Sequence, residues 1–186
     1  GPELGRGGMG RVMLARDRRH GRPVAIKELL RGGSHAAMRF EREAMITARL
    51  QHPGIVPVYE AGRWPSGEAF YAMKHVAGKS LSQLVAETNT LAERLALLPN
   101  VIAVADALAY AHGQGVIHRD LKPANIIVGS FGETVVIDWG VSKYIEGAVD
   151  PSHDSPISSG PIAGADLTVG RHTFGTPAYM PPEQAE

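Results

Sequence analysis

The stretch His118-Arg119-Asp120-Leu121-Lys122-Pro123-Ala124-Asn125 places an imidazole, a guanidinium, a carboxylate, an ammonium and a carboxamide within eight residues. Apolar runs flank it on both sides, Val116-Ile117 before and Ile126-Ile127-Val128 after. Short β-branched runs are typical of small buried strands, so the polar octet is predicted to be a loop held at both ends. Such a loop can hold an acid, a cation and a metal ligand close together. Each residue alone is more often an ordinary surface charge, but their order indicates a catalytic loop.

The composition limits the classes of protein to consider. The chain has 186 residues, of which 44% are hydrophobic, enough for a real core in one domain or two small lobes. The formal net charge is zero, so we expect no nucleic-acid partner. Without cysteine, disulfides and thiolate metal sites are excluded, and a cytoplasmic location is expected. No window is expected to be apolar enough to span a bilayer. Because the first residue is Gly1 rather than Met, we expect a piece of a longer protein, and a membrane anchor elsewhere in that protein is compatible with this.

A glycine-rich stretch near the start has the pattern G-x-G-x-x-G-x-V, formed by Gly5, Gly7, Gly10 and Val12. The dinucleotide-binding fingerprint shares its first six positions but requires a helix after the third glycine. Here residues 12–16 and 24–27 are predicted strands joined by a turn, so the glycines lie at the tip of a hairpin. A glycine tip lets backbone N–H groups approach phosphate oxygens, although an isolated glycine cluster is more often a flexible turn.

Lys27 ends the apolar run Val-Ala-Ile-Lys, so its ammonium is predicted to be partly buried and to need an anion. Residues 36–50 have apolar residues at mostly helical spacing, and Glu43 on that helix is the candidate partner. The alternative is that Glu43 is a solvated helix charge. Two further strands are predicted at 55–59 and 69–73, which makes the first lobe a mostly antiparallel sheet with one helix.

We place the lobe boundary after residue 77, with a first lobe of residues 1–77 and a second of 78–186. In the second lobe, residues 95–112 are predicted to form a buried helix that Pro99 starts or kinks. A buried strand at 134–137 leads into Asp138-Trp139-Gly140. The carboxylate of Asp138 and the amide oxygen of Asn125 are hard ligands that suit Mg²⁺.

These motifs resemble, in order and over nearly the whole chain, those of the protein kinase family, and most closely the bacterial serine/threonine kinases of the eukaryotic-like type. The resemblance rests on the glycine stretch, Val-Ala-Ile-Lys27, Glu43, the octet, Asp138-x-Gly140, Gly175-Thr176-Pro177 and Pro181-Pro182-Glu183. It implies an α+β fold with two lobes, a small antiparallel β-sheet lobe with one helix and an incomplete, mainly α-helical lobe. It also implies transfer of the ATP γ-phosphate to Ser or Thr hydroxyls of protein substrates, including autophosphorylation, and a dimer of kinase domains.

The resemblance assigns a role to each site residue. Lys27, paired with Glu43, contacts the α- and β-phosphates of ATP, and Asp138 and Asn125 hold Mg²⁺. Asp120 accepts the substrate hydroxyl proton, Lys122 neutralises the transferred phosphoryl group, and Thr176 hydrogen-bonds both. The nucleotide site is lined by Gly5, Gly7, Gly10, Val12, Ala25, Met73, His75, Val76 and Ile127.

A long segment between Tyr144 and Leu167 is too polar to bury much apolar area, so it is expected to be mobile. Arg119 beside Asp120 suggests regulation by phosphorylation of Thr168 or Thr173, with Lys143 assisting. The alternative is that these threonines merely cap or solvate the loop.

Two departures from the family pattern matter. Trp139 stands where most members have Phe, and its indole N–H needs a partner when buried. The chain stops soon after Glu183, so we expect uncovered apolar surface in the second lobe. A nucleotide-binding or scaffolding pseudokinase is therefore the competing hypothesis, while Thr176 in a segment resembling a peptide-docking loop disfavours a small-molecule kinase.

Overall fold

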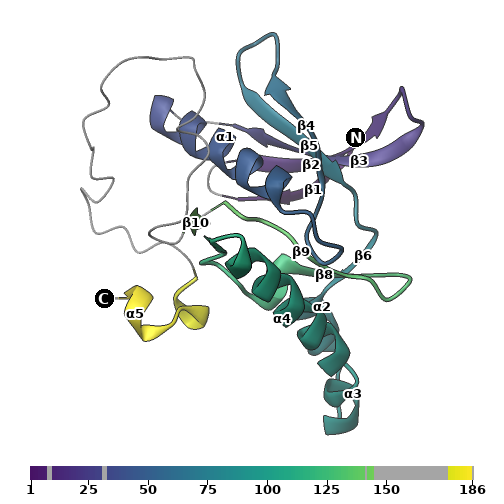
Figure 1. The fold of residues 1–186 in the computed structure, drawn as a ribbon. Coiled ribbons are helices and arrows are strands. Elements are labelled where there is room, and N and C mark those ends of the chain that lie inside the picture. Colours follow the sequence, from purple (N-terminus) through teal and green to yellow (C-terminus); the bar gives the residue numbers. More distant parts are fainter. Residues whose placement is uncertain (8–9, 31–32, 141, 145–175, 186) are drawn as a thin grey trace.

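The structure is a computed structural model, and it describes residues 1–7, 10–30, 33–140, 142–144 and 176–185. A twisted sheet carrying one helix forms the first lobe, and a second lobe with short strands and helices lies beside it (Figure 1). This agrees with the predicted α+β arrangement of two lobes.

The first lobe is a five-stranded antiparallel sheet in the order β1-β2-β3-β5-β4. Its strands are β1 (Glu3–Arg6), β2 (Gly10–Asp17), β3 (Arg22–Leu29), β4 (Val58–Arg63) and β5 (Ala69–Lys74). The β2–β3 turn needs Gly21, whose φ of 68° is costly for other residues. The glycine stretch lies in the β1–β2 hairpin, as predicted, with Gly5 in β1 and Gly10 at the start of β2.

Helix α1 (Ser34–Arg49) packs across one face of this sheet (Figure 1). Its inner side buries Phe40 and Ala44 against residues of β3 and β5, including Tyr71 and Met73. The predicted helix at 36–50 is thus confirmed within two residues at each end.

The strand predicted at 55–59 is wrong in position. β4 begins only at Val58 and runs to Arg63, whereas Ile55 makes an isolated bridge to Val136 of the second lobe. Ile55 and Val56 are almost completely buried, so their apolar character reflects packing between the lobes. Pro57 has no N–H and delays the start of the ladder.

The second lobe contains two small antiparallel sheets, β6-β8-β9 and β10-β7. The strands are β6 (Gly78–Ser80), β7 (Val116–Ile117), β8 (Ile126–Gly129), β9 (Thr134–Val136) and β10 (Lys143–Tyr144). The helices are α2 (Leu81–Glu87), α3 (Leu91–Leu95), α4 (Leu98–Gly113) and α5 (Pro182–Ala185), with short 3-10 turns at Pro123–Asn125 and Pro177–Tyr179. Capping boxes start α2 at Ser80 and α3 at Thr90. The sequence analysis did not predict β6 or α3.

Helix α4 selects one of two expected alternatives and corrects another expectation. Pro99 lies in its first turn and starts the helix rather than kinking it. The helix is not buried all round, because only Val104, Ala107 and Ala111 are buried while Ile102 is 61% exposed. Open apolar side chains continue along α3 and α4, as expected for this lobe: Leu91, Leu95, Leu98, Val101 and Ile102.

The expectation that no window is apolar enough to span a bilayer is also wrong. Residues Leu91–Gly113 are long and apolar enough to cross a membrane by length and composition. A helix built to be covered by other helices of its own domain has the same composition, so this property does not by itself indicate a membrane segment. Here the stretch is interrupted between α3 and α4. Helix α4 contributes Val104, Ala107 and Ala111 to the apolar core of the second lobe, which also contains Ile126 and Trp139.

Candidate active site

Lys27 and Glu43 form the buried ion pair that the sequence suggested. The Lys27 ammonium donates to Glu43 Oε1 at 2.5 Å, and the Glu43 side chain is 2% exposed. Burial raises the pKa of Glu43, and Lys27 only partly offsets this. Burial alone would lower the pKa of Lys27, but Glu43 and Asp138 outweigh it, so Lys27 remains charged.

Asp138 brings the second lobe to the same ammonium. Lys27 Nζ donates to Asp138 Oδ1 at 2.8 Å, although the two residues are 111 positions apart. Asp138 has a φ of 61°, a strained left-handed conformation for a residue with a side chain, of the kind that collects at functional sites. Burial disfavours the charged Asp138 carboxylate, but Lys27 outweighs this and lowers its pKa.

The residues after Asp138 are tightly packed. A Cβ atom at Gly140 would lie 3.0 Å from Glu43 Oε2 and 3.3 Å from Asp138 Oδ1, so the two carboxylates would have to shift by a few tenths of an ångström. Trp139 is 1% exposed and packs at 4.6 Å from the ring of His118. Its indole N–H has no hydrogen-bond partner among the residues that the structure describes, so the partner expected from the sequence is not seen there.

The octet forms a closed hydrogen-bond network around Asp120. Lys122 Nζ donates to Asp120 Oδ2 at 2.7 Å, and Thr176 Oγ1 donates to Asp120 Oδ1 at 2.8 Å. Lys122 also donates to Thr176 Oγ1 at 2.7 Å, which closes the triangle expected from the resemblance. The Asn125 amide donates to the Asp120 main-chain oxygen at 2.9 Å, which leaves the Asn125 side-chain oxygen available as a ligand.

Two hydrogen bonds join this loop to the Asp138 segment. The Ile137 amide donates to the Asn125 carbonyl at 2.9 Å, and His118 Nε2 lies 3.1 Å from the Ile137 carbonyl. His118 Nδ1 accepts from the Asp120 amide at 3.2 Å, so Nε2 carries the proton in a neutral ring. Burial lowers the pKa of His118, which agrees with the neutral form.

The glycine stretch has two kinds of glycine. A side chain at Gly10 would lie 2.3 Å from the Glu28 carbonyl of β3, so this position requires glycine for strand pairing. A side chain at Gly5 or Gly7 would meet no atom of the described residues within 4 Å, so the backbone there can approach a ligand.

The described residues contain no group of three or more His, Asp or Glu side chains that could hold a metal ion by themselves. Mg²⁺ commonly takes only one or two protein oxygens and completes its shell with phosphates and water. The oxygens of Asp138 and Asn125, on two loops joined through Ile137, fit that kind of site.

Comparison with known proteins decides the family. The sequence profile of the family described as "Protein kinase domain" matches residues 1–185. The chain belongs to the protein kinase family. It is 37% identical over 98% of its length to a serine/threonine-protein kinase PknD of Protochlamydia amoebophila. It is 39% identical over 97% of its length to PknD of Chlamydia trachomatis serovar D, and 36% identical to PknD of Chlamydia pneumoniae. This kinase domain spans about a fifth of the length of these relatives, with 20% and 21% of the first two covered.

The remaining residues that the resemblance assigns to the nucleotide site lie in β2, β3, β5, β8 and the connector between β5 and β6. Ala25 and Met73 are buried cross-strand partners on β3 and β5, and Val12 lies opposite Lys27 on β2. His75 and Val76 are half-buried in the connector between β5 and β6, and Ile127 is half-buried in β8.

The regulatory residues are only partly placed. Arg119 has a φ of 67°, and its carbonyl accepts from the Gln184 side chain at 2.9 Å. Lys143 lies in β10, paired with Ile117 of β7. Thr168 and Thr173 lie outside the described residues. Phosphorylation of this segment therefore stays a prediction.

Sequence analysis missed Tyr71, whose hydroxyl donates to Glu43 Oε1 at 2.7 Å. The signal was present in the alternating pattern of β5, where Tyr71 shares the inner face with Met73. Its contact with Glu43 could not be read from that alternation, because it depends on how α1 lies across the sheet.

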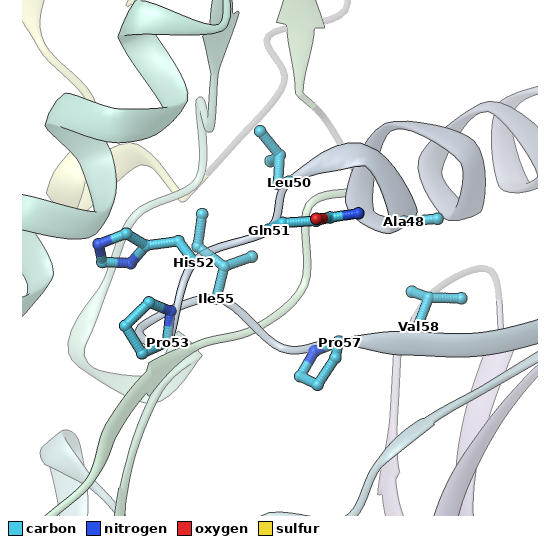
Figure 2. Close-up of a pocket in the computed structure, with 8 residues that line it drawn as sticks. All are labelled: Ala48, Leu50, Gln51, His52, Pro53, Ile55, Pro57 and Val58. Carbon is cyan, nitrogen blue, oxygen red and sulfur yellow. The ribbon is translucent and has the colours of Figure 1, made fainter.

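A hollow of about 390 Å³ lies away from these residues, between the end of α1 and the start of β4 (Figure 2). Its lining consists of Ala48, Leu50, Gln51, His52, Pro53, Ile55, Pro57 and Val58. The His52 ring stacks on Tyr110 of α4 with ring centroids 5.2 Å apart, so this loop joins the first lobe to the second. None of the catalytic residues lines the hollow.

Proposed function

We propose that the protein carrying this domain is a serine/threonine protein kinase that transfers the γ-phosphate of ATP, with Mg²⁺, to Ser or Thr hydroxyls of protein substrates. The observation that carries the proposal is the Asp120 carboxylate, whose two oxygens are held by Lys122 and Thr176. Membership of the family and the PknD names of its relatives support the same activity.

Each side chain of the site has a separate role in the proposed phosphoryl transfer. When bound, ATP would supply the phosphoryl group, and Mg²⁺ would supply positive charge to offset that of the phosphates. Lys27 offers a fixed cation for the phosphates, and the oxygens of Asp138 and Asn125 are suited to hold the metal. Asp120 orients the substrate hydroxyl and accepts its proton, since Lys122 and Thr176 keep the carboxylate from rotating. Lys122 then offsets the charge that builds up on the transferred group.

The test is transfer of label from [γ-³²P]ATP to a protein substrate, followed by analysis of the phosphorylated amino acids. Asp120→Asn should lower transfer by about 10²- to 10⁴-fold, the usual contribution of a general base. Asp106→Asn, at an exposed carboxylate of α4, is the matched control and should retain activity. Label on phosphoserine or phosphothreonine supports the proposal, whereas transfer that survives Asp120→Asn contradicts it.

The second candidate is a pseudokinase that binds nucleotide and does no chemistry. The exposed apolar side of α3 and α4 is open to cover by another protein, but Lys27, Asp120 and Asp138 are all placed for transfer, so this candidate is not favoured. ATP binding without any label transfer by the intact protein would select this candidate.

A further inference from the structure

Tyr71 donates a hydrogen bond to the Lys27–Glu43 ion pair, and the kinase motifs assign no role to this tyrosine. The Glu43 Oε1 atom accepts two hydrogen bonds, from the Lys27 ammonium at 2.5 Å and from the Tyr71 hydroxyl at 2.7 Å. Tyr71 is 2% exposed, so its hydroxyl has no access to bulk water as an alternative partner. A buried hydroxyl aimed at a buried carboxylate is a strong contact, since the acceptor is charged.

The strand register fixes Tyr71 next to the lysine. Tyr71 of β5 and Lys27 of β3 are direct cross-strand partners, so both side chains emerge on the face that α1 covers. The Tyr71 ring also packs against Phe40, one turn before Glu43 on α1, with ring centroids 5.3 Å apart. Helix α1 is thus attached to β5 at two points, through a ring contact and through a hydrogen bond.

The two donors to Glu43 differ in what else they must do. Lys27 is shared between Glu43 and Asp138, and in the proposed function it also meets the phosphates of ATP. The Tyr71 hydroxyl, in contrast, makes its hydrogen bond within the described residues to Glu43 alone. Burial, and then the Glu43 carboxylate, raise the pKa of Tyr71 well above its usual value, so the hydroxyl remains a neutral donor.

We propose that Tyr71 is a positioning residue of the phosphoryl-transfer site, whose hydroxyl holds Glu43 in place so that Lys27 stays directed at the nucleotide phosphates. This rests on the proposed kinase function and deepens it. The competing explanation is that Tyr71 is a core residue that uses Glu43 only to satisfy its own hydroxyl.

The decisive experiment is a double-mutant cycle in the intact protein with Tyr71→Phe and Glu43→Ala, because alanine removes the acceptor that glutamine would keep. Two quantities are measured: kcat/KM for ATP, and the dissociation constant of ATP with Mg²⁺ by calorimetry. Tyr71→Phe should lower kcat/KM about tenfold and weaken ATP binding, as for loss of a hydrogen bond to a charged group. In the Glu43→Ala background the same change should cost no more than about twofold, because the hydroxyl acts through the carboxylate that alanine lacks.

Two control variants separate positioning from packing. Tyr110→Phe removes a hydroxyl outside the site, on a half-buried ring, that accepts from the Gln51 amide at 3.1 Å, and it should leave kcat/KM within about twofold of the unmodified protein. Phe40→Leu removes the ring contact but keeps the Tyr71 hydroxyl. It should therefore lower the unfolding midpoint and leave kcat/KM within about twofold of the unmodified protein.

The proposal is overturned if Tyr71→Phe leaves both quantities within about twofold, or if its cost is the same with and without the Glu43 carboxylate. A protein that binds ATP but transfers no phosphate would refute the kinase function alone. In that case the cycle on the ATP dissociation constant still decides the role of Tyr71.

Discussion

The pair Lys27–Glu43 predicts an unequal response to removal of its two members. The Lys27 ammonium contacts two carboxylates, Glu43 at 2.5 Å and Asp138 at 2.8 Å. Glu43, in contrast, contacts one cation among the described residues, which is Lys27. After Glu43→Gln, the ammonium keeps Asp138, and the new amide can still accept from Tyr71. After Lys27→Met, a carboxylate that is 2% exposed is left without a cation.

The magnitudes follow from these contacts. Lys27→Met should lower the free energy of unfolding by about 3–5 kcal/mol, the cost of an uncompensated buried charge. Glu43→Gln should lower the free energy of unfolding by about 1–2 kcal/mol, because its hydrogen bonds are weakened but not lost. Lys79→Met is the control, because Lys79 and its partner Glu87 are both 56% exposed, and it should cost about 0–1 kcal/mol.

The assay is urea unfolding at neutral pH and again in mild acid. Burial raises the pKa of Glu43, and loss of Lys27 raises it further, so the folded Lys27→Met variant binds a proton more readily than its unfolded chain. Its stability deficit should therefore shrink as the pH falls. The reasoning is refuted if Lys27→Met costs no more than Glu43→Gln, or if acid enlarges the deficit.

Two further predictions concern other parts of the site. Gly10→Ala would place a methyl group 2.3 Å from the Glu28 carbonyl and should cost about 1–3 kcal/mol in urea unfolding, as overpacking does; Gly5→Ala, which meets nothing within 4 Å, should be close to neutral. Burial lowers the pKa of His118 from its ordinary 6.5, so the unfolded chain takes up this proton first and stability should fall as the pH drops below that value. His118→Phe should flatten this part of the stability–pH curve relative to the exposed control His112→Gln, and an unchanged slope would contradict the assignment.

Much of the first lobe was predictable because its signals are local. The apolar runs of β2 and β3, the turn between them and the spacing of apolar residues in α1 are each contained within a short stretch of sequence. The strand at 55–59 failed because a short apolar run does not distinguish a ladder strand from a buried linker. Ile55 belongs to the contact between lobes, and no local pattern reports that.

The order of charged and glycine residues in the sequence determined which side chains could do phosphoryl chemistry, and the resemblance gave their roles. Only the tertiary structure decided that Lys27 reaches Asp138 across 111 positions, that Tyr71 shares the Glu43 oxygen with Lys27, and that one side of α4 stays open. The physical reason is that hydrogen bonds and burial depend on how separate elements pack. A periodic pattern reports which face of an element is apolar, but it does not identify what that face will meet.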